Sequence, residues 1–341
     1  MGEQQYDSFD PAALTGRRRG PYLAFNPVSR VQVWQWCSAM GDHNPLYLDD
    51  DYRHRQGLGS GVVAPPAMMQ MWTMRDVNMR FAPGSTDEPP YEVFDVLSRR
   101  GFAGNVAVSY DIRFHRLLRE GDRAHHFNTI DSISELKRTA LGEGYFVVER
   151  AEFLDQQERL FAEALITYFQ YRPAGDAAAQ PAREPARPPI PATPPWRTDF
   201  QDILPGDIAA GDELPELVIP ITHKLIVSGA VATQDFIDVH HNAPAARDAA
   251  MPDIFMNILT TCGLCARYLS DWAGPCSRLR RLQLKLLAPN TPGDTMILRG
   301  RVTGVEQDTQ GGTLANVDFA GGNSRGFHVT GSAALELARQ K

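Results

Sequence analysis

The chain presents the same order of features twice. Each half contains a polar loop rich in acidic, Asn and His residues, GDHNPLYLDDDY at 41–52 and TQDFIDVHHN at 233–242. In each half a turn then opens an apolar segment, VVAPPAMMQMWTM from 62 and PDIFMNILTTCGLCARYL from 252, and the residues after it read as strands only. Any fold for this chain must accommodate two copies of such a unit.

The spacing inside the two copies also agrees. The loop acid precedes the predicted helix start by 24 residues in the first half, from Asp42 to Pro66, and by 22 residues in the second, from Asp235 to Asn257. Both halves then have a strand that runs into a Gly-Asp turn. This agreement indicates an internal duplication of a helix-plus-antiparallel-sheet unit.

A proline-rich stretch separates the copies. Residues 173–195 contain eight prolines, many alanines and no apolar periodicity, which is typical of an extended connector. The predicted organisation is therefore an N-terminal domain at 1–172, a linker at 173–195 and a C-terminal domain at 196–341. Each half has the length of a single domain.

The second half carries the clearer helix. Its apolar side chains recur at helical spacing on one face: Phe255, Ile258, Leu259, Cys262, Cys265, Ala266 and Leu269. Gly263 and the two cysteines are small enough to let strands pass close by, and we interpret the cysteines as core residues rather than as a zinc or redox pair. A long helix wrapped by a curved antiparallel sheet is the hot-dog architecture, so the sequence predicts an α+β double hot-dog fold.

Composition excludes several classes of function. The net charge of −7 lacks the positive field that a general nucleic-acid binder needs. Apolar stretches are too short for a membrane span or a signal peptide, and four cysteines are too few for a disulfide framework, so we expect a cytoplasmic protein. With no Gly-rich phosphate loop, nucleophile elbow or HExxH pattern, neither a nucleotide cofactor nor a metal is expected.

Asp235 and His240 are the residues that suggest chemistry. They lie five residues apart on one loop just before the helix, where a carboxylate and an imidazole can hold one water between them. The helix start near Asn257 offers free backbone N–H groups that would stabilise a thioester enolate oxygen. The pattern predicts addition of water to a double bond. His241 and Asp238 are interpreted as structural.

Both loops resemble a known family. GDHNPLYLD at 41–49 and ATQDFIDVHH at 232–241 are similar to the D-x-N-P-x-H loop of MaoC-like (R)-specific enoyl-CoA hydratases and of their steroid-degrading relatives. The second half resembles the catalytic subunit of a two-subunit steroid side-chain hydratase. Residues 20–75 resemble the MaoC domain of the partner subunit, so the resemblance identifies the chain as a fusion of the two.

This resemblance assigns roles to residues of the second half. It implies that Asp235 and His240 are catalytic, that the Asn257 N–H binds the oxyanion, and that coenzyme A enters only as part of the substrate. The first half departs from the family pattern, because Tyr47 replaces the His and Pro66 has no N–H at the oxyanion position.

The first half is accordingly expected to be degenerate, with Asp42 kept for loop structure. Its helix should be short, since Arg75, Asp76, Asn78 and Arg80 interrupt the apolar pattern. The space that this leaves, lined by Met68, Met71 and Trp72, would admit a bulky, steroid-like acyl group.

Alternatives and partners stay open at this point. The same site would serve a dehydratase acting on a carrier-protein-bound acyl chain, and a non-catalytic acyl-binding subunit would also keep the fold. Two basic clusters, Arg17–Arg19 and the set Arg278, Arg280, Arg281 and Lys285, are both candidates for the coenzyme A phosphates. A homodimer and a separate thiolase- or aldolase-type partner are compatible with the resemblance, since the chain stops at Lys341 after its last strand.

Overall fold

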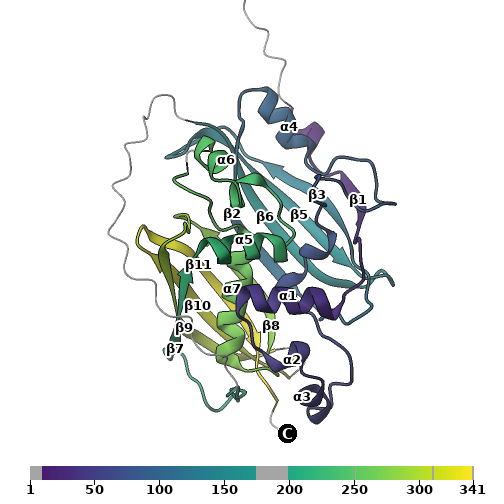
Figure 1. Ribbon diagram of the computed structural model, residues 1–341, viewed down its shortest axis with the longest axis vertical. Helices are drawn as coiled ribbons and strands as arrows, with labels where there is room; N and C mark the ends of the chain where they lie inside the picture. Colours follow the sequence, from purple (N-terminus) through teal and green to yellow (C-terminus); the bar gives the residue numbers. More distant parts are fainter. Residues whose placement is uncertain (1–9, 174–198, 250, 309–310, 340–341) are drawn as a thin grey trace, which may run out of the picture.

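The protein is described by a computed structural model that covers residues 10–173, 199–249, 251–308 and 311–339. Eleven strands form a single antiparallel sheet (Figure 1). The strands of the first half are β1 (Arg18–Leu23), β2 (Gly104–Phe114), β3 (His125–Ile133), β4 (Lys137–Thr139), β5 (Gly142–Leu154) and β6 (Leu160–Pro173). Those of the second half are β7 (Glu213–Ile221), β8 (Arg278–Leu286), β9 (Asp294–Gln307), β10 (Thr313–Asn323) and β11 (Gly326–Glu336).

The two halves contribute separate blocks of this sheet. The order is β1-β3-β5-β6-β2-β8-β11-β10-β9-β7, with β4 paired to β5. Within the described ranges, β2 with β8 is therefore the only strand pair that joins first-half to second-half strands. The junction runs from Ser109 opposite Lys285 to Arg113 opposite Arg281. It is stabilised by an ion pair, because the Arg281 guanidinium donates to both carboxylate oxygens of Asp111 at 2.9 and 2.6 Å.

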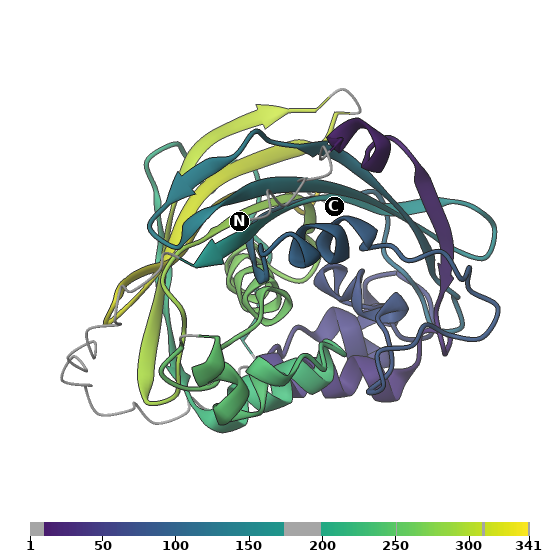
Figure 2. The ribbon, with the colours of Figure 1, turned by 90° about the horizontal axis from the view of Figure 1, so that it is seen from above.

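Helix α7 (Ile258–Ala273) lies inside the curve of the sheet (Figure 2). The Asn257 side chain caps its first turn, and Gly274 with φ 94° follows its last residue. Most of its residues are buried on all sides, including Cys262 and Cys265, whose free thiols pack in the core as predicted. A long helix held within a curved antiparallel sheet confirms the predicted α+β fold class.

The corresponding helix of the first half is missing. In its place are two short 3-10 turns, η2 (Pro66–Met68) and η3 (Met71–Thr73), so neither the long helix that a double hot-dog fold implies nor the short one expected for this half forms. Met74 is extended, and the Asp76 side chain accepts hydrogen bonds from the N–H groups of Asn78 and Arg80. Local turn chemistry therefore takes the backbone donors that a helix would need.

A later helix packs against the first-half sheet. Helix α4 (Glu92–Arg99) buries Val93 and Leu97 in a small core cluster with Ile130 and Val147. The sequence reading of strands alone after residue 74 missed it. Its apolar residues form too short a pattern to distinguish from a loop.

Helices α1 (Arg30–Met40) and α5 (His223–Ala232) lie across the open side of the fold (Figure 2), whereas η1 (Pro11–Leu14) packs against β3. The other short helices are α2 (Pro45–Leu48), α3 (Asp50–Arg55), η4 (Asp238–His240) and α6 (Ala243–Asp248). Gly263 of α7 faces α1 rather than strands, because a Cβ there would lie 2.9 Å from both Met40 and Trp36. The expectation that strands pass close to Gly263 is therefore wrong.

The predicted linker at 173–195 lies outside the described residues, except that Pro173 is the last residue of β6. Within the described ranges, no helix has the length and hydrophobicity to cross a membrane.

Candidate active site

Asp235 and His240 lie on a short connection between α5 and α6. Helix α5 ends at Ala232, and Gln234 then adopts a left-handed conformation with φ 55° that turns the chain back. The Asp235 N–H donates to the carbonyl of Ala230 at 2.9 Å. The 3-10 turn η4 then brings His240 to the same side as Asp235. Local hydrogen bonds thus fix both predicted residues.

The two side chains face each other in a buried setting. Nε2 of His240 lies 3.6 Å from Oδ2 of Asp235, and the two residues are 6% and 7% exposed. Nδ2 of Asn257 donates to the same Oδ2 at 2.9 Å. The other carboxylate oxygen, Oδ1, is buried and has no hydrogen-bond partner among the described residues. Asp235 therefore has one oxygen held in place and one still able to accept a hydrogen bond.

The orientation of His240 is set by a backbone carbonyl. Its Nδ1 lies 2.7 Å from the carbonyl oxygen of Phe255, and the Phe255 ring packs edge-on at 5.0 Å. Because a carbonyl oxygen only accepts, Nδ1 carries a hydrogen, and Nε2, which faces Asp235, is the acceptor of the ring in its neutral form. The pair can thus receive both hydrogens of one water molecule.

The start of α7 adds donors to this site. Oδ1 of Asn257 accepts from the N–H of Thr260 at 2.8 Å, so the residue that holds Asp235 also caps the helix. The backbone N–H of Asn257 donates to no acceptor in the part of the chain that the structure describes. It lies at the positive end of the helix dipole and suits a developing negative charge.

The matching region of the first half is built differently. Tyr47 and Pro66 line a cavity together with Asn44 and Ser270. Burial and the nearby Asp271 raise the pKa of Asp42 to about 7, and burial raises the pKa of Tyr47 well above its usual value. That Asp42, Tyr47 and Pro66 form a degenerate site stays a prediction.

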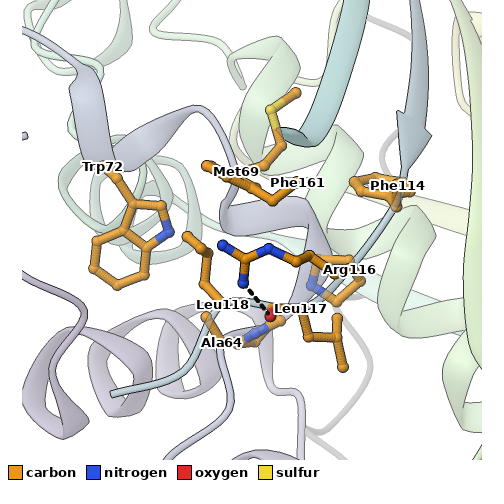
Figure 3. A pocket seen from close by; sticks show the side chains of 10 residues that line it. Ala64, Met69, Trp72, Phe114, Arg116, Leu117, Leu118 and Phe161 are labelled. Carbon is orange, nitrogen blue, oxygen red and sulfur yellow. Dashed lines mark hydrogen bonds between the residues drawn. The ribbon is translucent and has the colours of Figure 1, made fainter. Parts of the chain in front are cut away.

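The predicted acyl-pocket residues are all buried, but they do not share one cavity. Trp72 lines a pocket with Met69 and Arg116, whose guanidinium donates to the Leu117 carbonyl (Figure 3). Met68 and Met71 are core residues at 0% and 2% exposure. Their role in binding an acyl group stays a prediction.

A third cavity lies against the inner face of the first-half sheet. It is lined by Gln70, Thr73, Met74, Arg75, Phe81, Tyr91, His126, Glu149, Ala151, Phe153 and Ile166. No motif in the sequence indicated this cavity. Neither Asp235 nor His240 lines this cavity.

Other candidate groups have structural partners. His241 lies 3.7 Å from Asp238 at the surface. In the basic clusters, Arg17, Arg18 and Arg19 pair with Glu88, Glu152 and Glu92, and Arg280 pairs with Glu336. Among the described residues, no group of three or more His, Cys, Asp or Glu side chains is placed to hold a metal ion.

Comparison with known proteins connects this geometry to a family. Residues 15–164 match the family model described as FAS1-like, dehydratase domain region. The chain is also 41% identical to the beta subunit of 3-oxo-4,17-pregnadiene-20-carboxyl-CoA hydratase from Mycobacterium tuberculosis, over 37% of this chain and 95% of that subunit. The chain belongs to the MaoC-like hydratase family.

Other members of the MaoC-like family match a further part of the chain. The alpha subunit of the same M. tuberculosis hydratase is 32% identical, and a probable enoyl-CoA hydratase alpha subunit from Thermomonospora curvata is 35% identical. Each of these two matches covers 47% of this chain, which spans about half the length of these alpha subunits. One polypeptide is thus similar to both subunits of a two-subunit enzyme.

Solved structures agree on the fold. A MaoC-like dehydratase superimposes with a TM-score of 0.66 at 19% identity, covering 96% of this chain and 99% of that one. A conserved hypothetical M. tuberculosis protein described as having a double hotdog fold gives 0.60 at 14% identity, covering 95% and 96%. These similarities confirm the predicted double hot-dog fold of this MaoC-like chain.

Proposed function

We propose that this protein is an enoyl-CoA hydratase that adds water across the α,β double bond of a bulky acyl-CoA thioester. The observation that carries the proposal is the buried pair of Asp235 and His240, 3.6 Å apart beside the N-terminus of α7. The named activities of the family relatives, an enoyl-CoA hydratase and a pregnadiene-carboxyl-CoA hydratase, support it.

In the proposed reaction one water bridges Asp235 and His240. It donates its two hydrogens to the carboxylate and to the unprotonated Nε2, which aims its oxygen at the β-carbon. As the C–O bond forms, one proton passes to this pair and the electrons of the double bond move onto the thioester oxygen. Return of that proton to the α-carbon completes the addition, and no cofactor is consumed.

The Asn257 N–H is proposed to bind the thioester oxygen during this step. It has no acceptor within the described ranges and belongs to the residue that caps α7. A preorganised donor at a helix N-terminus stabilises an enolate more than it stabilises the uncharged thioester.

The acyl group is proposed to extend into the first half, through the space that the missing helix leaves. The cavity that Ala151 lines lies on the inner face of the first-half sheet. Its mostly apolar wall includes Phe153, Ile166 and Met74. Together with the substrate named for the M. tuberculosis relatives, this favours a steroid side-chain thioester over a linear one.

A second candidate is the reverse reaction on a carrier-protein-bound acyl chain. The match of residues 15–164 to a dehydratase region favours it, and the same Asp235 and His240 would serve. Parallel assays with a ring-bearing enoyl-CoA and with a 3-hydroxyacyl carrier protein separate the two candidates. Faster turnover of the carrier-bound substrate would support the dehydratase.

The proposal is tested by following the loss of enoyl-thioester absorbance with wild-type protein and three variants. Asp235→Asn and His240→Ala are each expected to lower kcat by about 100-fold or more, with the fold retained. The matched control, Asp42→Asn, changes the corresponding acid of the first half and should leave the rate near that of wild type. If Asp42→Asn lost activity while Asp235→Asn and His240→Ala did not, the site would lie in the first half and our assignment would be wrong. Release of free thiol would indicate a thioesterase.

A further inference from the structure

The last turn of α5 lies in close contact with the first turn of α7. A Cβ at Gly229 would lie 2.4 Å from Oγ1 of Thr260 and 2.7 Å from its Cγ2, so no larger residue fits at position 229 without a shift. Gly229 and Thr260 are both buried. The glycine therefore lets the two helix ends approach until polar side chains near them can bond directly.

Thr233 directly follows α5 and makes such a bond. Its Oγ1 accepts a hydrogen bond from Nδ2 of Asn257 at 2.9 Å and donates to the carbonyl oxygen of Ala230 at 3.2 Å. Thr233 is 0% exposed, so solvent does not compete for these bonds. Because the hydrogen of the hydroxyl is directed at Ala230, its oxygen faces Asn257 as an acceptor.

The side-chain amide of Asn257 has both hydrogens and its oxygen in use. One hydrogen of Nδ2 goes to Thr233 and the other to Oδ2 of Asp235, also at 2.9 Å. Oδ1 of Asn257 accepts from the N–H of Thr260. An amide is planar and has two hydrogens, so an acceptor for one of them fixes the direction of the other. The hydroxyl of Thr233 thus directs the second hydrogen of the amide at Asp235.

The first half lacks this hydroxyl. Met40 stands two residues before Asp42, where Thr233 stands two residues before Asp235. Met40 is buried, and its sulfur lies 2.9 Å from where a Cβ on Gly263 would be, so it packs against the middle of α7. A thioether has no hydroxyl with which to orient an amide. The hydroxyl therefore occurs only in the half to which we assign the reaction, as expected of a residue that serves it.

We propose that Thr233 is a positioning residue for the hydration reaction. Its hydroxyl oxygen orients the amide of Asn257, which holds Oδ2 of Asp235 and leaves the buried Oδ1 open to the attacking water. The proposal rests on the proposed function for the role of Asp235, and it goes beyond that function by naming the residue that sets where the carboxylate lies. Misplacement of a reacting group by about 1 Å can lower a rate about 100-fold, so a residue that acts only through Asn257 can control turnover.

Two substitutions separate positioning from packing. Thr233→Val keeps the shape of the side chain but replaces the accepting oxygen by a methyl group, which cannot lie 2.9 Å from Nδ2 of Asn257, so the amide must move. We expect kcat to fall about 10- to 100-fold, with KM changed much less and the melting temperature near that of wild type. Thr233→Ser keeps the hydroxyl and loses a buried methyl group, so it should melt at a lower temperature and keep a kcat close to that of wild type. Rates that follow the melting temperatures of the two variants instead would overturn the proposal.

The rates are measured on the full chain with a ring-bearing enoyl-CoA, and a second buried threonine supplies the matched control. Thr291 is 1% exposed, and its hydroxyl has no partner in the part of the chain that the structure describes. Thr291→Val should therefore leave kcat unchanged, and a loss equal to that of Thr233→Val would count against the proposal. If Thr233→Val does not fold, Thr233→Ala removes the hydroxyl without a methyl group in its place and should show the loss of kcat.

Crystal structures of the variants make the test independent of turnover. The distance from Nδ2 of Asn257 to Oδ2 of Asp235 should exceed about 3.5 Å in Thr233→Val and stay near 2.9 Å in Thr233→Ser. If these distances are found but wild-type protein hydrates no enoyl-CoA, the orienting role of Thr233 stands and the hydratase function fails. If wild-type protein hydrates an enoyl-CoA but Thr233→Val changes neither the distance nor kcat, the hydratase function stands and the positioning role fails.

Discussion

Nδ2 of Asn257 donates to Oδ2 of Asp235 at 2.9 Å, while Oδ1 of the same side chain caps α7. One side chain therefore links the position of the carboxylate to the start of the helix. A shift of the helix would move the oxyanion donor and the proposed base together. This coupling keeps the distance between the two constant, which is what a site that must act on both ends of a conjugated thioester requires.

The two roles of Asn257 can be separated. In Asn257→Ser the cap is kept, because serine caps a helix about as well as asparagine, but the shorter side chain does not reach Asp235. We expect the melting temperature to stay near that of wild type and kcat to fall about tenfold. Asn44→Ser makes the same exchange at the cap of α2 and should leave kcat unchanged. A full loss of stability with normal kcat in the folded fraction would contradict the positioning role.

Asp42 gives a pH dependence of stability with a definite sign. The pKa of Asp42 in the folded protein is raised to about 7, above its pKa in the unfolded chain. The stability that the protonated carboxyl contributes is therefore fully present below about pH 4 and is lost as the pH rises through 7. Asp42→Asn removes this titration. The variant should gain stability relative to wild type by up to ~4 kcal/mol between pH 4 and pH 8.

Denaturant unfolding of both proteins at several pH values measures this difference. Glu149 titrates in the same range in both proteins, so its contribution cancels in the comparison. A difference that stays constant from pH 4 to pH 8 would contradict a raised pKa of Asp42.

Filling the cavity under the first-half sheet should affect large substrates selectively. Ala151 lines the cavity, and its cross-strand partner Ala164 is equally buried but does not line it. We expect Ala151→Leu to lower kcat/KM for a ring-bearing enoyl-CoA about tenfold or more and to leave crotonyl-CoA much less affected. Ala164→Leu should impose similar overpacking without this selectivity. Equal losses for both substrates in Ala151→Leu would argue against an acyl group in this cavity.

The two halves should work only together. Separate polypeptides that end and begin within the predicted linker are expected to co-purify when expressed together, because β2 and β8 pair across buried Ile112 and Leu282. Either half alone would expose this strand edge and should be insoluble or inactive. A tag on one half and an assay of the co-purified complex test this. Full activity of residues 196–341 alone would show that the first half contributes nothing to the site.

The sequence predicted those features that depend on local pattern. Helical spacing located α7, and the order of loop, turn and strands indicated two copies of one fold. The proximity of Asp235 and His240 followed from their position on one loop before a helix, and the structure brings them within 3.6 Å. Such short-range relationships need no knowledge of strand register.

The features that the sequence did not predict depend on long-range packing. Glu149 lies in the strand segment FVVERAEFL. The alternation of its side chains does not show which face is inward until the pairing with β3 and β6 is known. Its neighbour Asn128 comes from another strand, and Tyr91 from the loop before α4. Only the folded sheet brings these residues together, so no motif in the sequence could have revealed the cavity.

The single junction between β2 and β8 also bears on how this protein could have diverged. In a symmetric dimer encoded by one gene, both subunits carry every substitution. A substitution that disrupts the central helix and enlarges one pocket would therefore also disrupt that helix in the partner, together with its oxyanion donor. Here Pro66 and Asn257, which the sequence predicts to be corresponding positions of the repeat, belong to one chain, so each can mutate without the other. Because the two copies are encoded separately within one chain, their sequences can change independently. Selection for a larger substrate can then act on one copy while selection for rate acts on the other.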